Sequence, residues 1–172
     1  MGFRRIHILG SYALDILLIS AFSAQHLIKD VVSFDTTSWR FYADLEFLMI
    51  PIDLRAVRLR LDIHWPDSIL NYHCVCPYCN GLSVGEIRLM GYSDKRELLA
   101  MHNFWCVDTA AKAFYTLAAD PKKLRIYLLN NSNRRKLIER ICRTMLIILS
   151  MKHRLNDPKF NRSFAQHIYD LY

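Results

Sequence analysis

Residues 74–79 read Cys-Val-Cys-Pro-Tyr-Cys and place Cys74, Cys76 and Cys79 within six residues of a 172-residue chain. The chain has five cysteines, an odd number, so a framework of disulfides does not account for all of them. Three closely spaced thiols instead match a metal site, in which thiolates and imidazoles bind Zn²⁺ tetrahedrally. A proline-containing turn can hold the three sulfur atoms close together. The stretch therefore predicts a zinc site.

The fourth ligand of this site has three candidates. His102 follows Cys79 after 22 intervening residues and lies in a predicted helix that can bring an imidazole to the fourth corner of the tetrahedron. His73 adjoins the first cysteine, and Cys106 lies one helical turn beyond His102. We favour His102. Four protein ligands leave no open position for water or substrate, so the predicted zinc is structural. Buried cysteines beside an unrelated histidine are the alternative.

The composition is that of a packed globular domain with a moderately basic surface. Hydrophobic residues make up 52% of the chain, and five glycines and five prolines exclude a fibrous or low-complexity protein. The length fits one domain with its own core. The formal charge of +7 suits a polyanionic partner such as nucleic acid, although many basic proteins bind none.

Neither apolar stretch of the sequence predicts a membrane span. The first, residues 6–24, is interrupted by His7, Gly10 and Asp15 and is not followed by a signal-peptide cleavage pattern. The second, residues 145–151, is far shorter than the roughly 20 residues that a span requires. Reduced thiols are typical of the cytosol, so we expect a cytoplasmic protein that does not contact a membrane.

The N-terminal half of the sequence predicts short strands around one helix. Residues 5–10 predict a strand that ends at a glycine, residues 13–26 an amphipathic helix, and residues 30–34 a second buried strand. Strand, helix and strand in this order form a βαβ unit, the building block of parallel sheets and of barrels. Apolar and polar residues alternate in residues 54–64, which predicts a half-exposed strand in a hairpin with residues 47–52.

The C-terminal half predicts helices. Residues 84–91 can form a short helix, and residues 95–117 a longer one that holds His102 and stops before Asp120-Pro121. The remainder, residues 122–172, is predicted to be helical and basic, with a break at residues 130–133.

The cysteine spacing has a specific continuation in residues 98–103, Leu-Leu-Ala-Met-His-Asn. Together the two motifs resemble the zinc subdomain of the tRNA-guanine transglycosylase family, in which the same cysteine spacing precedes a Leu-Leu-x-x-His-Asn stretch that supplies the last ligand. The lead-in Pro66-Asp67-Ser68 is also similar to that of the family. The resemblance therefore supports His102 as the fourth ligand.

The resemblance extends upstream to Asp35. The predicted strand at residues 5–10 is similar to the strand that precedes the nucleophile strand of the family. Phe34-Asp35 is similar to the Phe-Asp at the end of the nucleophile strand, and its separation from Cys74 is close to that of the family. The resemblance implies that Asp35 is the catalytic nucleophile. From the residues alone, Asp35 can equally cap a turn.

For the fold, the resemblance implies an α/β chain that forms the C-terminal portion of a (β/α)₈ TIM-type barrel with an inserted zinc-binding subdomain. Residues 1–117 would be the partial barrel, with the zinc region at 64–117, and residues 118–172 a helical, basic extension without a family motif. The family barrel begins with strands that precede this portion and carry the base-recognition residues. We therefore expect a second chain or a homo-oligomer to complete the barrel.

For the activity, the resemblance implies a pentosyltransferase of the guanine transglycosylase type, the reaction that leads to queuosine in tRNA. The aspartate attacks C1′ of a nucleotide in DNA or tRNA, guanine leaves, and a 7-deazaguanine base resolves the covalent aspartyl-nucleotide. The alternative is a non-catalytic, zinc-binding module of the same origin that binds nucleic acid or a catalytic partner.

Two stretches depart from the pattern of the tRNA enzymes. Residues 36–40, Thr-Thr-Ser-Trp-Arg, replace the usual Cys-Val-x-Pro-Thr-Arg and are more similar to the paralogues that place 7-deazaguanines in DNA, which favours DNA as the acceptor. Residues 81–86, Gly-Leu-Ser-Val-Gly-Glu, are similar to the base-binding loop of the family. That loop precedes the nucleophile in the family, whereas here the stretch follows the third cysteine, so we interpret this similarity as coincidental.

Four arginines near the predicted nucleophile are candidates for phosphate contacts. They are Arg40, Arg55, Arg58 and Arg60. Arginine side chains commonly position nucleic acid through its backbone. The alternative is that they form the solvated face of a strand.

Overall fold

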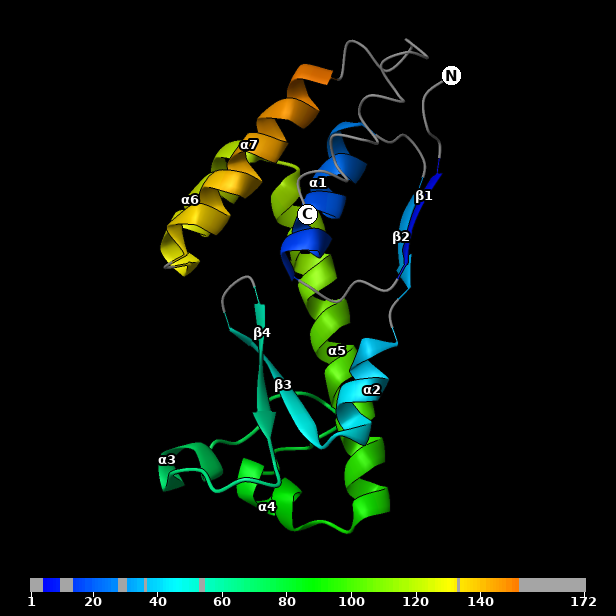
Figure 1. Ribbon diagram of the computed structural model, residues 1–172, viewed down its shortest axis with the longest axis vertical. Helices are drawn as coiled ribbons and strands as arrows, with labels where there is room; N and C mark the ends of the chain where they lie inside the picture. Colours follow the sequence, from blue (N-terminus) through cyan, green and yellow to red (C-terminus); the bar gives the residue numbers. More distant parts are fainter. Residues whose placement is uncertain are drawn as a thin grey trace. The chain divides into compact units, whose positions relative to one another are not determined.

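The computed structural model describes residues 5–9, 14–27, 31–35, 37–52, 55–132 and 134–151 (Figure 1). These residues form an α/β chain with more helix than strand. The elements, in order, are β1 (Arg5–Leu9), α1 (Leu14–His26), β2 (Val31–Asp35), α2 (Ser38–Asp44), β3 (Phe47–Ile52), β4 (Arg55–Arg60), α3 (Asp67–Leu70), α4 (Val84–Leu89), α5 (Tyr92–Ala118), α6 (Pro121–Asn131) and α7 (Arg135–Met151).

The chain divides into two compact units. The first, here called the helical unit, contains residues 1–8, 18–34 and 114–172, and the second, the zinc unit, contains residues 9–17 and 35–113. In the described part of the chain the strands form two two-stranded sheets, β1 with β2 and β3 with β4. The strand, helix and strand predicted for the N-terminal segment are present as β1, α1 and β2. A barrel portion and its boundary near residue 117 stay predictions.

In the helical unit, the end of α1 is bound to the end of α5. His26 Nε2 lies 2.8 Å from the carbonyl oxygen of Ala118, and Gln25 Nε2 donates to the carbonyl oxygen of Tyr115 at 3.1 Å. These side chains satisfy two of the carbonyls that the last turn of a helix leaves without partners. Five consecutive residues of α1, from Leu18 to Phe22, are buried, including Ser20. The helix is therefore present as predicted, but this part of it is buried around its circumference, and the predicted amphipathic character is wrong.

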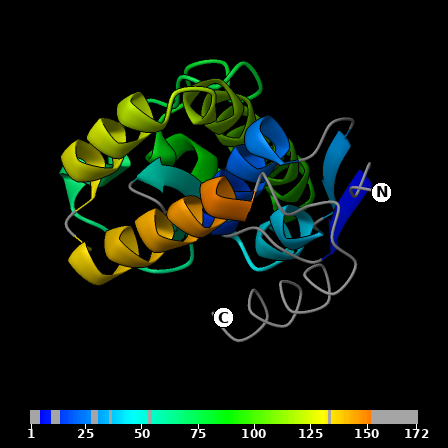
Figure 2. The same cartoon turned by 90° about the horizontal axis from the view of Figure 1, so that it is seen from above.

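Helices α6 and α7 form a helical hairpin, which Figures 1 and 2 both show as two neighbouring, oppositely directed helices. Asp120 caps α6, because its carboxylate accepts hydrogen bonds from the backbone N–H groups of Lys122 at 2.9 Å and Lys123 at 3.2 Å. Pro121 occupies the first turn, where its missing N–H costs nothing. Both helices bury residues at helical spacing, namely Leu124, Leu128, Leu137, Ile138, Ile141, Met145 and Ile148.

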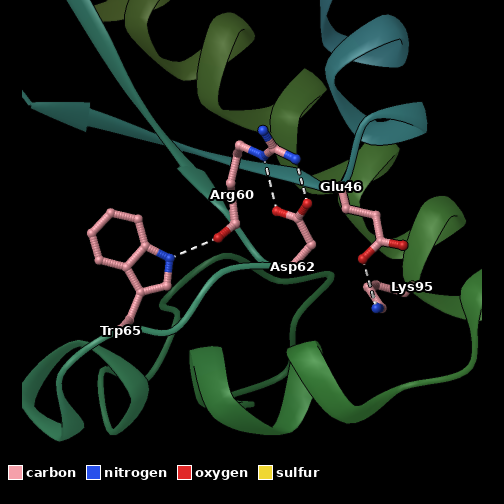
Figure 3. Close-up of polar contacts among 5 residues, drawn as sticks. All are labelled: Glu46, Arg60, Asp62, Trp65 and Lys95. Carbon is pink, nitrogen blue, oxygen red and sulfur yellow. Dashed lines mark hydrogen bonds and ion pairs between the residues drawn. The ribbon is translucent and has the colours of Figure 1, made fainter.

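The zinc unit is built around the antiparallel hairpin β3–β4, as predicted. Leu48 pairs with Leu59 in its register, and both are buried. The predicted alternation holds at Leu59 and Leu61, but Val57 and Ile63 are 41% and 42% exposed. The second strand ends at Arg60, earlier than expected. The guanidinium of Arg60 is bound to the carboxylate of Asp62, and the chain turns at residues 61 and 62 (Figure 3).

Helix α2 and the turn after it were not predicted. The turn reaches β3 through Glu46, whose φ of 55° lies in the left-handed region that non-glycine residues rarely adopt. The carboxylate of Glu46 accepts from Lys95 Nζ at 2.8 Å, at the start of α5 (Figure 3). Arg96 binds Asp44, the last residue of α2. Two ion pairs between segments that are distant in sequence thus fix the turn, and no local pattern signals them.

Among the described residues, no helix combines the length and the apolar character that a membrane span needs.

Candidate metal centre

The three cysteines lie on a tight loop that is stabilised by its own backbone. The N–H of Cys76 lies 3.5 Å from Cys74 Sγ, and the N–H of Cys79 donates to Cys76 Sγ at 3.3 Å. After Cys79 the chain turns back through Asn80 and Gly81, with φ values of 49° and 78°. Glycine tolerates this conformation without steric cost. The loop therefore turns the sulfur atoms inward.

The loop is closed by a short antiparallel pairing. The N–H of Cys74 donates to the carbonyl of Leu82 at 3.0 Å, and Leu82 donates to the carbonyl of Cys79 at 2.9 Å. His73 pairs with Ser83, and its exposed ring places Nδ1 2.7 Å from the carbonyl oxygen of Gly81. His73 is thus engaged outside the cysteine cluster, which removes it as the fourth ligand.

The structure brings together the four side chains favoured from the sequence. Cys74, Cys76, Cys79 and His102 are all buried, and their ligand atoms lie within 4.8 Å of one another. The Nδ1 atom of His102 lies 3.3 Å from Cys74 Sγ, 3.3 Å from Cys76 Sγ and 3.5 Å from Cys79 Sγ. Bond lengths to Zn²⁺ place the sulfur and nitrogen ligands of a tetrahedral site about 3.6 Å apart. The four residues can therefore hold one metal ion such as zinc.

The other ring nitrogen of His102 is held by strand β3. Nε2 lies 2.7 Å from the carbonyl oxygen of Met49, so a proton on Nε2 is donated to this oxygen and the lone pair of Nδ1 is directed at the cysteines. Histidine ligands of metals commonly use this arrangement, because the hydrogen bond fixes both the tautomer and the ring orientation. The carbonyl of Met49 thus prepares His102 for metal binding.

Asn103, the neighbour of His102 on α5, fixes the strand that carries this carbonyl. It is fully buried. Its Oδ1 accepts from the N–H of Met49 at 2.9 Å, and its Nδ2 donates to the carbonyls of Phe47 at 3.0 Å and Trp39 at 3.2 Å. One amide therefore uses three of its hydrogen-bonding positions to lock β3 onto α5. The sequence motif contained this asparagine but assigned it no role.

Cys106 lies beside the centre but not among its ligands. Its Sγ is 3.4 Å from His102 Nε2, the ring nitrogen that faces away from the three cysteines, and 3.4 Å from the carbonyl oxygen of Met49. Burial, followed by the neighbouring thiols Cys74 and Cys76, raises the pKa of Cys106 to about 12. Cys106 is therefore a protonated thiol that packs under the imidazole, and the geometry favours His102 over it as the fourth ligand.

The protonation of the ligands reflects their burial. Burial raises the pKa of the Cys74 and Cys79 thiols, and the neighbouring sulfur atoms raise that of Cys79 further. Burial lowers the pKa of His102, so its imidazole is kept neutral. A neutral imidazole is ready to bind a cation, whereas several thiolates in this space need one to offset their repulsion. The donor set therefore fits a divalent metal.

Residues 81–86, which are similar to a base-binding loop, have a local structural task here. Ser83 and Glu86 form a capping box at the start of α4: the N–H of Ser83 donates to Glu86 Oε2 at 2.7 Å, and the N–H of Glu86 donates to Ser83 Oγ at 3.2 Å. A side chain at Gly85 would place its Cβ 3.2 Å from the carbonyl oxygen of Leu70, so glycine permits the close approach of α3 and α4. These contacts account for the stretch without a bound base.

A pocket of about 690 Å³ lies next to the ligands in the zinc unit. Its lining is apolar, with Ser68 and Tyr72 as the hydroxyl-bearing residues beside the ligands Cys74 and His102. None of the described residues in this lining carries a carboxylate. The remaining lining residues are Leu48, Met49, Ile50, Val57, Leu59, Trp65, Ile69, Val75, Val84, Trp105 and Cys106.

Two predicted site residues have side chains outside the described part of the structure. The backbone of Asp35 forms the end of β2, as expected for the predicted nucleophile, but its side chain is not among those described. The same holds for Arg55, the first residue of β4. The structure therefore leaves both roles as predictions.

The other three predicted phosphate contacts are engaged within the zinc unit. Arg58 lies over the ring of Tyr42, with its guanidinium carbon 4.5 Å from the ring centroid, and donates to the hydroxyl of this tyrosine. Arg60 donates to the two carboxylate oxygens of Asp62 through its Nε and Nη2 atoms (Figure 3). Arg40 lies 3.8 Å from the carboxylate of Asp44. Arg58 and Arg60 share one face of β4, but each already has a partner.

No protein-family model matches the chain, and neither a curated protein nor a solved structure is significantly similar to it.

Proposed function

We propose that this chain is the zinc-stabilised, nucleophile-bearing portion of a guanine transglycosylase-type enzyme that replaces guanine in DNA or tRNA by a 7-deazaguanine. The observation that carries the proposal is the Cys₃His cluster. Its ligands follow one another with the spacing Cys-x-Cys-x-x-Cys and then His-Asn, and a strand that ends in an aspartate, Asp35, precedes them in the sequence. This order of elements is the one that the resembled family uses.

The metal in this proposal is Zn²⁺, and its task is structural. Three sulfur ligands and one imidazole favour zinc over the hard cations that prefer oxygen. Four buried protein ligands fill a tetrahedron and leave no coordination position for a substrate. When bound, the ion would connect the cysteine loop with α5, and its binding free energy would contribute directly to folding.

In the proposed reaction, the carboxylate of Asp35 forms a bond to C1′ of the target nucleotide while the bond from C1′ to N9 of guanine breaks. Guanine leaves with the electron pair and takes up a proton. The incoming 7-deazaguanine then attacks C1′, loses a proton, and releases the carboxylate. A carboxylate suits both steps because the transition state carries positive charge on the sugar. The end of a barrel strand is where such a residue belongs.

The proposal implies that other barrel strands act together with this portion. In the resembled family these strands recognise the base, and we propose that a second chain, a second copy or a longer gene product supplies them. The C-terminal portion of a (β/α)₈ barrel, with β1, α1 and β2 as one of its βαβ units, is the corresponding fold proposal. The target nucleotide must also leave its stack, which costs a few kcal/mol that surrounding contacts must offset.

The experiment is base exchange in a reconstituted complex. We expect the isolated chain to exchange no radiolabelled guanine in DNA or tRNA, and the complex with the partner strands to do so. Asp35→Asn and Asp35→Ala should abolish exchange, because neither can form the covalent intermediate, while zinc content stays at one per chain. Asp44→Asn, which alters an aspartate of the same unit that is bound by arginines, is the matched control. Unchanged activity in Asp35→Ala would rule out its role as nucleophile.

A second candidate function is a non-catalytic zinc-binding module that binds nucleic acid or a catalytic partner. The observation that favours it is the closed, buried coordination sphere, which organises structure and offers no reactive position. The two candidates differ in one measurement. A covalent adduct of the chain with a nucleic acid, trapped by denaturation and lost in Asp35→Asn, supports the enzyme, whereas binding without an adduct in any reconstituted complex supports the module.

A further inference from the structure

The positive charge of the chain is concentrated in the hairpin of α6 and α7. Residues 120–151 contain eight lysines and arginines and two acidic residues, a net charge of 8 − 2 = +6, compared with +7 for the whole chain. The cations are Lys122, Lys123, Arg125, Arg134, Arg135, Lys136, Arg140 and Arg143. The acidic residues are Asp120 and Glu139. The rest of the chain is therefore close to neutral.

The two carboxylates of the hairpin are too few to neutralise these cations. Asp120 is occupied by the N–H groups that it caps, and Glu139 lies 3.8 Å from Arg135. The side chains of Lys123 and Lys136 are exposed. In the zinc unit, by contrast, Arg58, Arg60 and Arg96 have carboxylate or aromatic partners. The hairpin thus presents positive charge to the solvent.

Four of the cations lie at helix N-termini, where the helix dipole disfavours positive charge. Lys122 and Lys123 lie in the first turn of α6, and Arg135 and Lys136 in the first turn of α7, and neither first turn contains an acidic residue. The N-terminus of a helix carries partial positive charge, so cations there are disfavoured by about 0.3–1 kcal/mol each. The helix dipole therefore does not favour this arrangement, whereas an anionic ligand would.

The cations extend along the hairpin instead of converging on one point. A groove of about 610 Å³ between the helices has Lys122 and Arg125 on its α6 side and Arg135 with its partner Glu139 on its α7 side, and the rest of its described lining is largely apolar. Helix α6 has 11 residues and is about 16 Å long. A single phosphate group is much smaller than this length, whereas a nucleic acid repeats its phosphate charges along the whole backbone, at roughly one charge per ~1.7 Å of duplex axis. The spacing therefore fits an extended polyanion.

We propose that the α6–α7 hairpin binds the phosphodiester backbone of the nucleic-acid substrate. The choice of a nucleic acid among polyanions rests on the proposed function. Within the described part of the chain, the lining of the groove includes neither an aromatic side chain that could stack on a base nor an amide that could read a base edge, so the contacts that it offers are to the backbone. The hairpin positions the substrate, and the arginines of β4 contribute less because they are engaged within their own unit.

The test measures the affinity of the full-length, zinc-loaded chain for a fluorescein-labelled 20-base-pair duplex and for a tRNA between 50 and 300 mM KCl. The hairpin variant is Lys123→Gln/Lys136→Gln. The control variant Arg88→Gln/Lys112→Gln removes the same charge from α4 and α5. Each lost phosphate contact lowers the affinity about 8-fold at 0.1 M salt and reduces the slope of log K against log salt by about 0.9. We expect a loss of about 60-fold and a slope change of about 1.8 in the hairpin variant alone.

The melting temperature of the hairpin variant should stay at or above that of the wild type, because both substitutions remove cations from the first turn of a helix. The control variant loses a favourable cation in the last turn of α4 and the exposed ion pair between Lys112 and Asp108, so its melting temperature should fall only slightly. Equal losses in the two variants, or an unchanged affinity and slope in the hairpin variant, would overturn the inference. So would hairpin-dependent binding of polyglutamate, or of vesicles with equal phosphatidylserine and phosphatidylcholine, at least as tight as that of nucleic acid. Hairpin-dependent binding without base exchange in any complex would contradict the proposed function and leave this inference standing.

Discussion

The zinc unit and the α6–α7 hairpin stabilise themselves by different means. In the zinc unit, short elements converge on four buried ligand side chains, and several of its charged residues, such as Glu46 with Lys95 and Asp44 with Arg96, pair within the unit. In the hairpin, two helices bury apolar stripes against their surroundings, and cations outnumber carboxylates on their surface. The elements α3 and α4 of the zinc unit have 4 and 6 residues and are too short to be stable alone.

Stability and recognition are thus assigned to different regions, the first to the metal site of the zinc unit and the second to the surface of the hairpin. A metal can replace a large apolar core in a small unit because it joins distant segments at one point. The hairpin needs no metal, and its surface is therefore free to carry unbalanced charge at a modest cost in stability. The following predictions test this division, beginning with the largest effect.

Removal of the metal should unfold the zinc unit and leave the hairpin folded. Binding of zinc to structural sites contributes about 10–16 kcal/mol in isolated zinc fingers, so the zinc unit should lose its cooperative fold in the presence of a chelator or in Cys76→Ser. Acidification should act in the same direction, because protons compete with the metal for the thiolates. Amide hydrogen exchange would show loss of protection at residues 73–103 and retained protection at residues 124–148. Joint loss in both segments would contradict the division.

Truncation of the hairpin core should destabilise the chain whether or not metal is present. Ile141 of α7 is fully buried, and Ile141→Ala should cost about 2–5 kcal/mol through lost burial and a cavity. Urea titrations followed by circular dichroism, with and without chelator, measure this cost. Ile126→Ala on α6, where the side chain is 58% exposed, is the control and should change stability by less than about 0.5 kcal/mol. A cost that disappears on chelation would show that the regions are coupled.

Loss of the Asn103 amide should weaken the metal centre from outside its ligands. Asn103→Ala leaves the N–H of Met49 and two carbonyls without their partner, at a cost of about 2–4 kcal/mol. Because Met49 orients His102, zinc affinity should also fall about 10- to 100-fold. Competition with a chromophoric chelator measures the affinity, and the Co²⁺ absorption spectrum reports the geometry of the site. Asn130→Ala, at an exposed position of α6, should change neither, and an unchanged affinity in Asn103→Ala would remove its positioning role.

The two helix caps should give the smallest effects and should differ in their dependence on metal. Ser83→Ala removes the capping box of α4, and Asp120→Ala removes the cap of α6, each at a cost of about 1 kcal/mol. The effect of Ser83→Ala should vanish once the metal is removed, since α4 is then unfolded, whereas that of Asp120→Ala should persist. Thermal unfolding with and without chelator distinguishes the two. Identical behaviour of both caps would contradict the comparison.

Sequence patterns predicted the elements whose information is local. The apolar spacing of α1, the alternation at Leu59 and Leu61, and the Asp120-Pro121 signal between α5 and α6 each depend on neighbours within a few residues. The cysteine spacing is equally local, and the structure brings all three thiols together with His102. The metal site could therefore be predicted from this single sequence, because it requires particular residue types at a particular spacing.

Contacts between distant segments could not be predicted. The partners of Asn103 lie on β3 and at Trp39, far before it in the sequence, and the left-handed Glu46 is fixed by Lys95 of α5. Neither of these contacts produces a periodic pattern in the sequence. Val57 and Ile63 occupy the apolar positions of the alternating pattern, but both are exposed. Whether such a position is buried depends on which element covers that face of the strand, and the alternation does not contain this information.

Because the ligand cysteines are buried, the occupancy of the metal site can be measured by chemical labelling. Cys74, Cys76, Cys79 and Cys106 are each at most 6% exposed, and Cys142 alone of the five thiols is partly accessible. Alkylation of the native, metal-loaded chain should therefore add a single label at Cys142, while chelation opens the remaining positions. The number of labels per molecule, read from an intact mass, becomes a direct measure of the fraction of chains that hold their ion.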